Sequence, residues 1–132
     1  MNRVKATITD IESHGNISLV RLDSEGVKFT SVILDTPESS PFIHTGNQVT
    51  ILFKETEVIV CTGEPGQISL RNRIRGKIKM IEKGQLLSRI ITETAVGRIR
   101  ALITTNAVSD LMLHEGGDIF VMIKTNELML SE

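Results

Sequence analysis

The chain repeats itself at an offset of seventy residues. At that offset, 12 of the 62 aligned pairs are identical, including Asn2/Asn72 and Lys54/Lys124. Chance would give roughly four identities at ordinary residue frequencies. Gly and Pro residues at 63–67 have the composition of a linker between the copies. The sequence therefore predicts a first repeat at 1–62, a linker at 63–67 and a second repeat at 68–132, both with the same fold.

Each repeat has the pattern of a small β unit. Ile74, Ile78 and Met80 alternate with Arg and Lys residues, which predicts a strand with one solvated face. Further strands are predicted at 89–92, 97–103, 118–124 and 127–130, and a helix at 105–113 with Thr or Asn as its N-cap. In the first repeat, two prolines within 36–41 leave at most one helical turn. The predicted fold is all-β: two tandem OB-fold-like small barrels, each with one short helix or turn.

Size, charge and cysteine content exclude several classes of protein. A barrel of about 62 residues is marginal alone, so we expect the barrels to pack together and the chains to associate. The net charge of −1 argues against a general binder of nucleic acid or membrane surfaces. A single cysteine, Cys61, excludes a disulfide framework, and no apolar leader or spanning segment is present, so a cytoplasmic location is expected. Residues 66–132 carry ten Lys and Arg against seven Asp and Glu, and residues 1–65 carry five against nine.

Two short motifs mark the ends of the second repeat. It opens with Ser69-Leu70-Arg71-Asn72-Arg73-Ile74-Arg75-Gly76 and closes with Ile123-Lys124-Thr125-Asn126-Glu127-Leu128. These strings resemble the signature ends of the Mop domain, which open Ser-Ala-Arg-Asn-x-Leu-x-Gly and close Ile-Lys-Ala-Ser/Thr-x-Val. Between them, Ser88 and Ile103-Thr104 also match the family pattern. The similarity extends more weakly over 1–62, so the chain resembles a molbindin with two Mop domains of the TOBE type.

That resemblance implies the function, the ligand and the assembly. Molbindins bind molybdate or tungstate without chemistry upon it, so the chain is expected to be a cytoplasmic oxyanion-binding protein for storage and homeostasis, not an enzyme. It implies no organic cofactor, and no metal ion bound directly by side chains. Family members hold the oxyanion between Mop domains of neighbouring chains, so a homotrimer with sites between chains is implied.

A tetrahedral dianion offers only acceptor oxygens, so its site must supply donors and positive charge. Ser69 and Thr125 offer hydroxyls, Arg71 a planar fork of N–H groups, and Lys124 a compact charge. The complete candidate set is Ser69, Leu70, Arg71, Asn72, Thr104, Lys124 and Thr125, with Ser88 and Lys54 as secondary candidates. Arg73, Arg75, Lys77 and Lys79 are interpreted as the solvated face of a strand. His44 and His114 stand in glycine turns without other ligands at metal-binding spacing, and are expected to be structural or exposed.

The first repeat departs from the motif. No Ser-x-Arg precedes Asn2, Leu34 stands where the second repeat has Thr104, and Glu55 stands where it has Thr125. Because a carboxylate would repel an oxyanion, the first repeat is predicted to have lost its own site and to act as a scaffold. Its Lys54 could still reach a site built mainly by a second repeat.

Two other functions remain open from the sequence. An assembly or regulatory domain with a decayed anion site would keep the fold and lose the ligand. A nucleic-acid-binding OB module is less favoured, because four Phe and no Tyr or Trp make a poor stacking platform. No catalytic motif appears, so no enzyme activity is expected.

Overall fold

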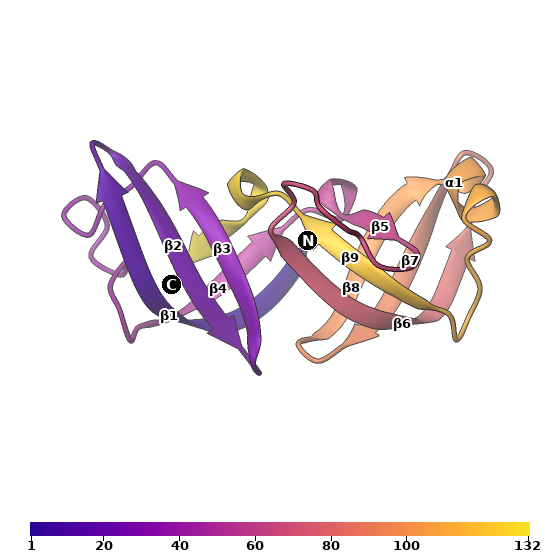
Figure 1. Cartoon of the computed structure of the whole chain (residues 1–132), viewed down its shortest axis with the longest axis horizontal. Helices are drawn as coiled ribbons and strands as arrows, with labels where there is room; N and C mark the ends of the chain where they lie inside the picture. The colour runs from indigo at the N-terminus through magenta and orange to yellow at the C-terminus, as the bar shows by residue number, and fades with distance from the viewer.

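The protein consists of two five-stranded antiparallel sheets, each curled into a small barrel, placed end to end. The computed structural model describes all residues 1–132. Figure 1 shows the barrels side by side along the longest axis. The strands of the first repeat are β1 (Asn2–His14), β2 (Ile17–Ser24), β3 (Val27–Ile33), β4 (Gln48–Phe53) and β5 (Ile59–Cys61). Those of the second are β6 (Asn72–Lys83), β7 (Leu87–Thr94), β8 (Gly97–Thr104), β9 (Asp118–Ile123) and β10 (Met129–Ser131).

The last strand of each repeat pairs with the other repeat. β5 lies antiparallel to β9, with Val60 opposite Val121. β10 lies antiparallel to β4, with Leu130 opposite Ile51. The strand orders are therefore β10-β4-β1-β2-β3 and β5-β9-β6-β7-β8, and in Figure 1 the yellow β10 completes the indigo and purple barrel. Each barrel thus takes one strand from the other half of the sequence.

Alternating apolar residues line both barrels. On β1 the inward positions Val4, Ala6 and Ile8 are buried, and the residues between them are more exposed, as expected for a strand with one solvated face. The buried apolar residues of both repeats form one continuous cluster of 21 residues, which includes Val58 and Leu128 just before the exchanged strands. The exchange therefore joins the two barrels through a shared core.

A β-bulge turns the Met80 side chain outward, contrary to the orientation predicted from the alternation of residues. The register of β6 against β7 shifts between Ile78 and Met80, and β1 has the matching shift between Ile8 and Asp10. A one-residue shift turns the following side chains to the other face of the sheet. Met80 is consequently 44% exposed, and Ile81 packs against the core in its place.

The single α-helix is shorter than the sequence predicts. α1 (Thr105–Asp110) begins at an N-cap, Thr104, whose side chain accepts a hydrogen bond from the Ala107 N–H. It ends early because Met112 adopts a left-handed conformation with φ of 53°. In the first repeat the corresponding segment forms only a turn, in which Thr36 O accepts from the N–H groups of Ser39 and Ser40.

Two short 3₁₀ helices precede the exchanged strands. These are η1 (Glu55–Glu57) and η2 (Thr125–Glu127), so the strand predicted at 127–130 begins only at Met129. None of the helices has the length and apolar character needed to cross a membrane.

The predicted fold class, two OB-like β barrels with one short helix or turn in each, is confirmed.

Candidate functional site

Two cationic residues lie next to each other just beyond the ends of paired strands, at the start of the second barrel. β6 begins at Asn72, which lies opposite Ile123, the last residue of β9. Arg71 immediately precedes β6 and Lys124 immediately follows β9, and both are exposed. Neither side chain forms an ion pair or a hydrogen bond within the protein. Because like charges at facing positions of a strand pair are unfavourable, this end of the sheet is suited to an anion.

The hydroxyl donors beside these cations are also unused. Ser69 is exposed and Thr125 is partly exposed, and neither side chain has a hydrogen-bond partner in the protein. Other cations on β6 are paired instead: Arg75 with Glu64 at 2.9 Å and Lys77 with Asp118 at 3.0 Å. Lys79 lies 3.8 Å from Glu93. The side chains of the predicted site therefore keep free hydrogen-bond donors, whereas the neighbouring cations of β6 are paired. The predicted site consists of Ser69, Arg71, Lys124 and Thr125.

Asn72 lies in the same group, but its side chain is fully engaged. It is 0% exposed. Its Oδ1 accepts from the Thr30 N–H at 2.7 Å, and its Nδ2 donates to Thr30 O at 2.9 Å and to Ile123 O at 3.0 Å. A primary amide has two donor hydrogens, and both are used here. The Asn72 side chain thus has no donor left for a ligand, and joins β6 to the edge of β3.

Arg73 has a structural role that the sequence interpretation missed. Its guanidinium donates to three backbone carbonyls of the preceding loop: Leu70 O at 2.8 Å, Gly66 O at 2.9 Å and Ile68 O at 2.9 Å. Alternation along β6 indicates only that Arg73 faces away from the core. No sequence signal indicates that the loop wraps around its side chain.

Ser88 and Thr104 lie in a second group, away from the first. Both are at the end of β6 where it joins β7: Ser88 pairs with Lys83 of β6, and Thr104 with Leu87. β6 has 12 residues, and a strand rises about 3.3 Å per residue, so most of its length separates this group from Asn72. Ser88 Oγ lies 2.8 Å from Thr105 Oγ1, whose own hydroxyl donates to Gly84 O. One chain therefore does not bring all the predicted residues together.

In the first repeat, a carboxylate occupies the position that corresponds to Thr125. Glu55 Oε1 accepts from Arg89 Nε at 2.7 Å, and Arg89 Nη1 also contacts Glu82 at 3.2 Å. The hydrogen bond from Arg89, together with its charge, lowers the pKa of Glu55 below its usual value. Glu55 is thus a partly exposed anion at neutral pH, fixed by its ion pair with Arg89. Its neighbour Lys54 is exposed and has no partner.

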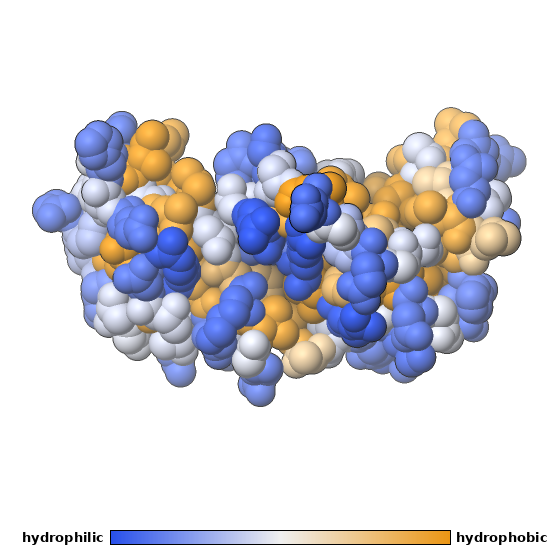
Figure 2. Space-filling view, in the orientation of Figure 1, coloured by the Kyte–Doolittle hydropathy of each residue, from blue (hydrophilic) through white to orange (hydrophobic).

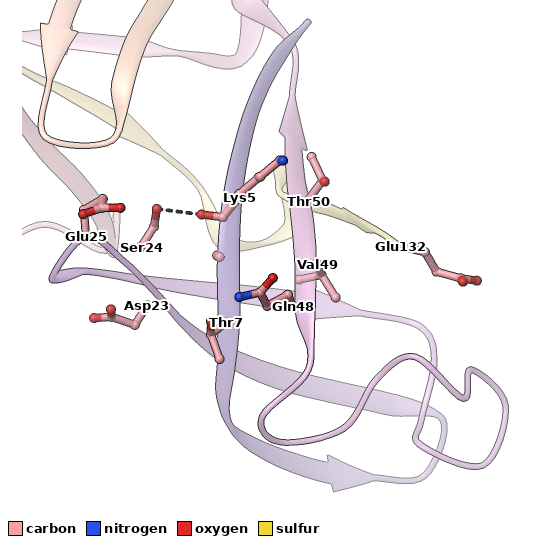
Figure 3. A pocket seen from close by; sticks show the side chains of 10 residues that line it. Lys5, Thr7, Asp23, Ser24, Glu25, Gln48, Val49, Thr50 and Glu132 are labelled. Atoms are coloured by element: carbon pink, nitrogen blue, oxygen red, sulfur yellow. Dashed lines mark hydrogen bonds between the residues drawn. The ribbon is translucent and has the colours of Figure 1, made fainter.

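The main surface cavities are lined by other residues. A cleft of about 460 Å³ opens on the first barrel between β1, β4 and the β2–β3 turn. Figure 3 shows Asp23 and Glu25 on one side of β1, with the Lys5 side chain on the other. A second cavity of about 530 Å³ lies beside α1, lined by Ile78 and apolar residues that follow the helix. Figure 2 shows hydrophobic patches over both barrels, separated by hydrophilic residues.

Comparison with known families gives a match in both repeats. The model of the TOBE domain matches residues 1–60 and again residues 68–130. The molybdenum-pterin-binding protein MopB of Rhodobacter capsulatus is 29% identical over 109 residues, which make up 81% of this chain and 40% of that protein. Molybdenum-pterin-binding protein 3 of Clostridium pasteurianum is 30% identical over 64 residues, 48% of this chain and 94% of that protein. The matched region is thus less than half of MopB and nearly all of the shorter relative.

A solved structure matches nearly the whole chain. It is that of the cytoplasmic molybdate-binding protein ModG, crystallised with molybdate bound. The two superpose with a TM-score of 0.92 at 25% sequence identity, and the match covers 98% of this chain and 94% of that one.

Proposed function

The chain belongs to the TOBE domain family as a tandem, molbindin-type protein, and on this premise we propose that it binds molybdate or tungstate for storage and homeostasis in the cytoplasm. Binding is reversible and involves no chemistry on the anion. The relatives named molybdenum-pterin-binding proteins and the likeness to the molybdate-binding protein ModG support the ligand class.

The observation that carries the proposal is the pair of facing, unpaired cations at the start of the second barrel. Arg71 and Lys124 supply positive charge, and the hydroxyls of Ser69 and Thr125 and the Leu70 N–H supply further donors. Hydrogen bonds to a charged group contribute about 1.5–3 kcal/mol each. Four or five of them are enough for micromolar affinity, about −8 kcal/mol, after the costs of association.

The separation of the two groups supports sites between chains. Ser88 and Thr104 lie at the far end of β6 from Arg71, so a site that uses both groups has to draw them from two chains. Exposed apolar residues are available for such contacts: Leu34 is 74% exposed, Leu86 82% and Met112 79%. We therefore propose a homotrimer in which each anion lies between neighbouring chains, with Thr104 and Ser88 in supporting roles.

The first repeat is proposed to be a scaffold without an anion site of its own. Glu55 already places a carboxylate where Thr125 would offer a hydroxyl, and Arg89 holds that carboxylate in position from within the chain. A second anion there would meet a fixed negative charge. Each chain should consequently contribute one strong site.

Isothermal titration calorimetry with sodium molybdate tests the proposal. We expect one site per chain with micromolar or tighter affinity. Arg71→Ala and Lys124→Ala should each weaken binding at least about tenfold with the fold intact, because each removes a charge-assisted bond. Lys54→Ala is the matched control from the first repeat and should change affinity less than either. Wild-type protein that takes up no molybdate or tungstate would contradict the function, and two equal sites per chain would contradict the scaffold role.

A further inference from the structure

Arg73 is outside the proposed ligand set, yet its side chain shapes the loop that carries three of those ligands. Its guanidinium donates to Gly66 O, Ile68 O and Leu70 O at 2.8–2.9 Å. We propose that Arg73 is a positioning residue of the oxyanion site, which holds Ser69, Leu70 and Arg71 in their binding arrangement. The inference rests on the proposed function and extends it to a residue that does not touch the anion.

The loop 62–71 has little else to fix its conformation. None of its residues belongs to a strand or helix, and no backbone–backbone hydrogen bond of the turns and loops involves them. It also contains Gly63 and Gly66, both with φ of 73°, which are flexible in the absence of other restraints. Besides Arg73, only Arg75, through Glu64, and the weak Cys61 thiol donor contact it by hydrogen bonds. The order of the loop therefore depends chiefly on Arg73.

The chemistry of this contact requires arginine. A guanidinium presents five N–H donors in one rigid plane, so Nε, Nη1 and Nη2 can each hold a different carbonyl at the same time. A lysine ammonium carries the same charge on a flexible stem and cannot fix three acceptors in a plane. Because three of its donors already bind carbonyl groups, Arg73 acts on the loop and leaves the anion to Arg71.

Another arginine of β6 provides the comparison. Arg75, two residues further along β6, also contacts the loop, but through one ion pair with Glu64 at 2.9 Å, and its guanidinium stacks 4.8 Å from the centre of the Phe120 ring.

The test compares Arg73→Met, Arg73→Lys and Arg75→Met in the 132-residue protein by molybdate calorimetry and by ¹⁵N relaxation of the ligand-free state. We expect Arg73→Met to bind at least about tenfold more weakly, and Arg73→Lys about threefold or more, although its charge is unchanged. Backbone order parameters at 69–71 should fall in both variants, with the thermal midpoint of unfolding kept within about 3 °C. Arg75→Met removes the same charge from the same strand and should change affinity less than about twofold.

Each contrary result has a separate meaning. Wild-type affinity in Arg73→Lys together with weak binding in Arg73→Met would overturn the positioning role, because charge alone would then explain the effect. Wild-type affinity in both variants would overturn it too, even if the loop became more mobile. Wild-type protein that binds no molybdate would remove the proposed function and this role together. If Arg73→Met fails to fold, the charge-conserving Arg73→Lys decides between the outcomes.

Discussion

At the residue scale, a buried asparagine at the start of each repeat serves as a connector between the barrels. Asn72 of β6 bonds to both backbone groups of Thr30 on β3. Asn2 of β1 does the same to Arg100 on β8, accepting at 2.8 Å and donating at 2.9 Å. Because a side-chain amide has the same donor and acceptor as a peptide group, each asparagine continues a sheet edge where the backbone itself cannot reach.

Replacing Asn72 by alanine should therefore destabilise the protein more than it affects ligand chemistry. The change leaves the Thr30 N–H and two carbonyl oxygens without their partner, and we expect a loss of about 2–3 kcal/mol in the free energy of unfolding. Asn2→Ala, which removes two bonds instead of three, should cost less. Urea unfolding at fixed protein concentration measures both. A loss below about 0.5 kcal/mol for Asn72→Ala would contradict the connector role.

The opening motif shows what sequence reasoning can and cannot recover at this scale. The pattern identifies Ser69 and Arg71 as donors, and the structure leaves both without internal partners. The sequence pattern does not distinguish Asn72 from these two donors, because an asparagine that binds a ligand and one that binds backbone look alike in sequence. The role of Arg73 is even harder to predict from the sequence, because its partners are backbone carbonyl groups, which every residue has.

At the element scale, alternation predicts where the strands lie but not their irregularities or their partners. The bulge in β6 turns Met80 outward, and nothing in the local pattern marks it. Val60 on β5 and Leu130 on β10 are equivalent positions of the repeat, and either strand could pair with β4 or β9 in the same register. Sequence periodicity therefore leaves the strand exchange undetermined, because both pairings bury the same residues.

Gly76 gives a sharp test of packing in β6. A Cβ at this position would lie 2.3 Å from Thr92 Cγ2 and 2.9 Å from the Glu93 carbonyl oxygen, which cannot move without displacing β7. Gly76→Ala should lower the free energy of unfolding by about 1–3 kcal/mol. The matched position of the first repeat holds Ala6, where Ala6→Gly should cost only about 1 kcal/mol, for backbone entropy and a lost methyl group. Thermal unfolding measures the stability of both variants. Equal or higher stability of Gly76→Ala than of the wild type would show that β7 moves to accommodate the methyl group.

At the scale of the whole molecule, the exchanged strands make the two barrels depend on each other. The first barrel is closed on one edge by β10 and the second by β5, and the residues before both strands belong to the shared core. This arrangement also places η1 and its Glu55 beside the second barrel, where Arg89 pairs with it. One carboxylate of the acidic first repeat is thus paired with a cation of the second barrel.

An isolated second repeat should therefore not remain a monomer. A polypeptide of residues 68–132 keeps β10 but lacks β5, so the edge of β9 is left open. A second copy can supply its own β10 to that edge, because β10 and β5 are equivalent strands of the repeat. We expect this fragment to be at least a dimer in light scattering after size exclusion, and to dissociate and unfold together on dilution. A monomer with native β content would mean that β10 folds back onto its own β9, and that the exchange in the whole chain results from the short loop between the repeats and not from the strands themselves.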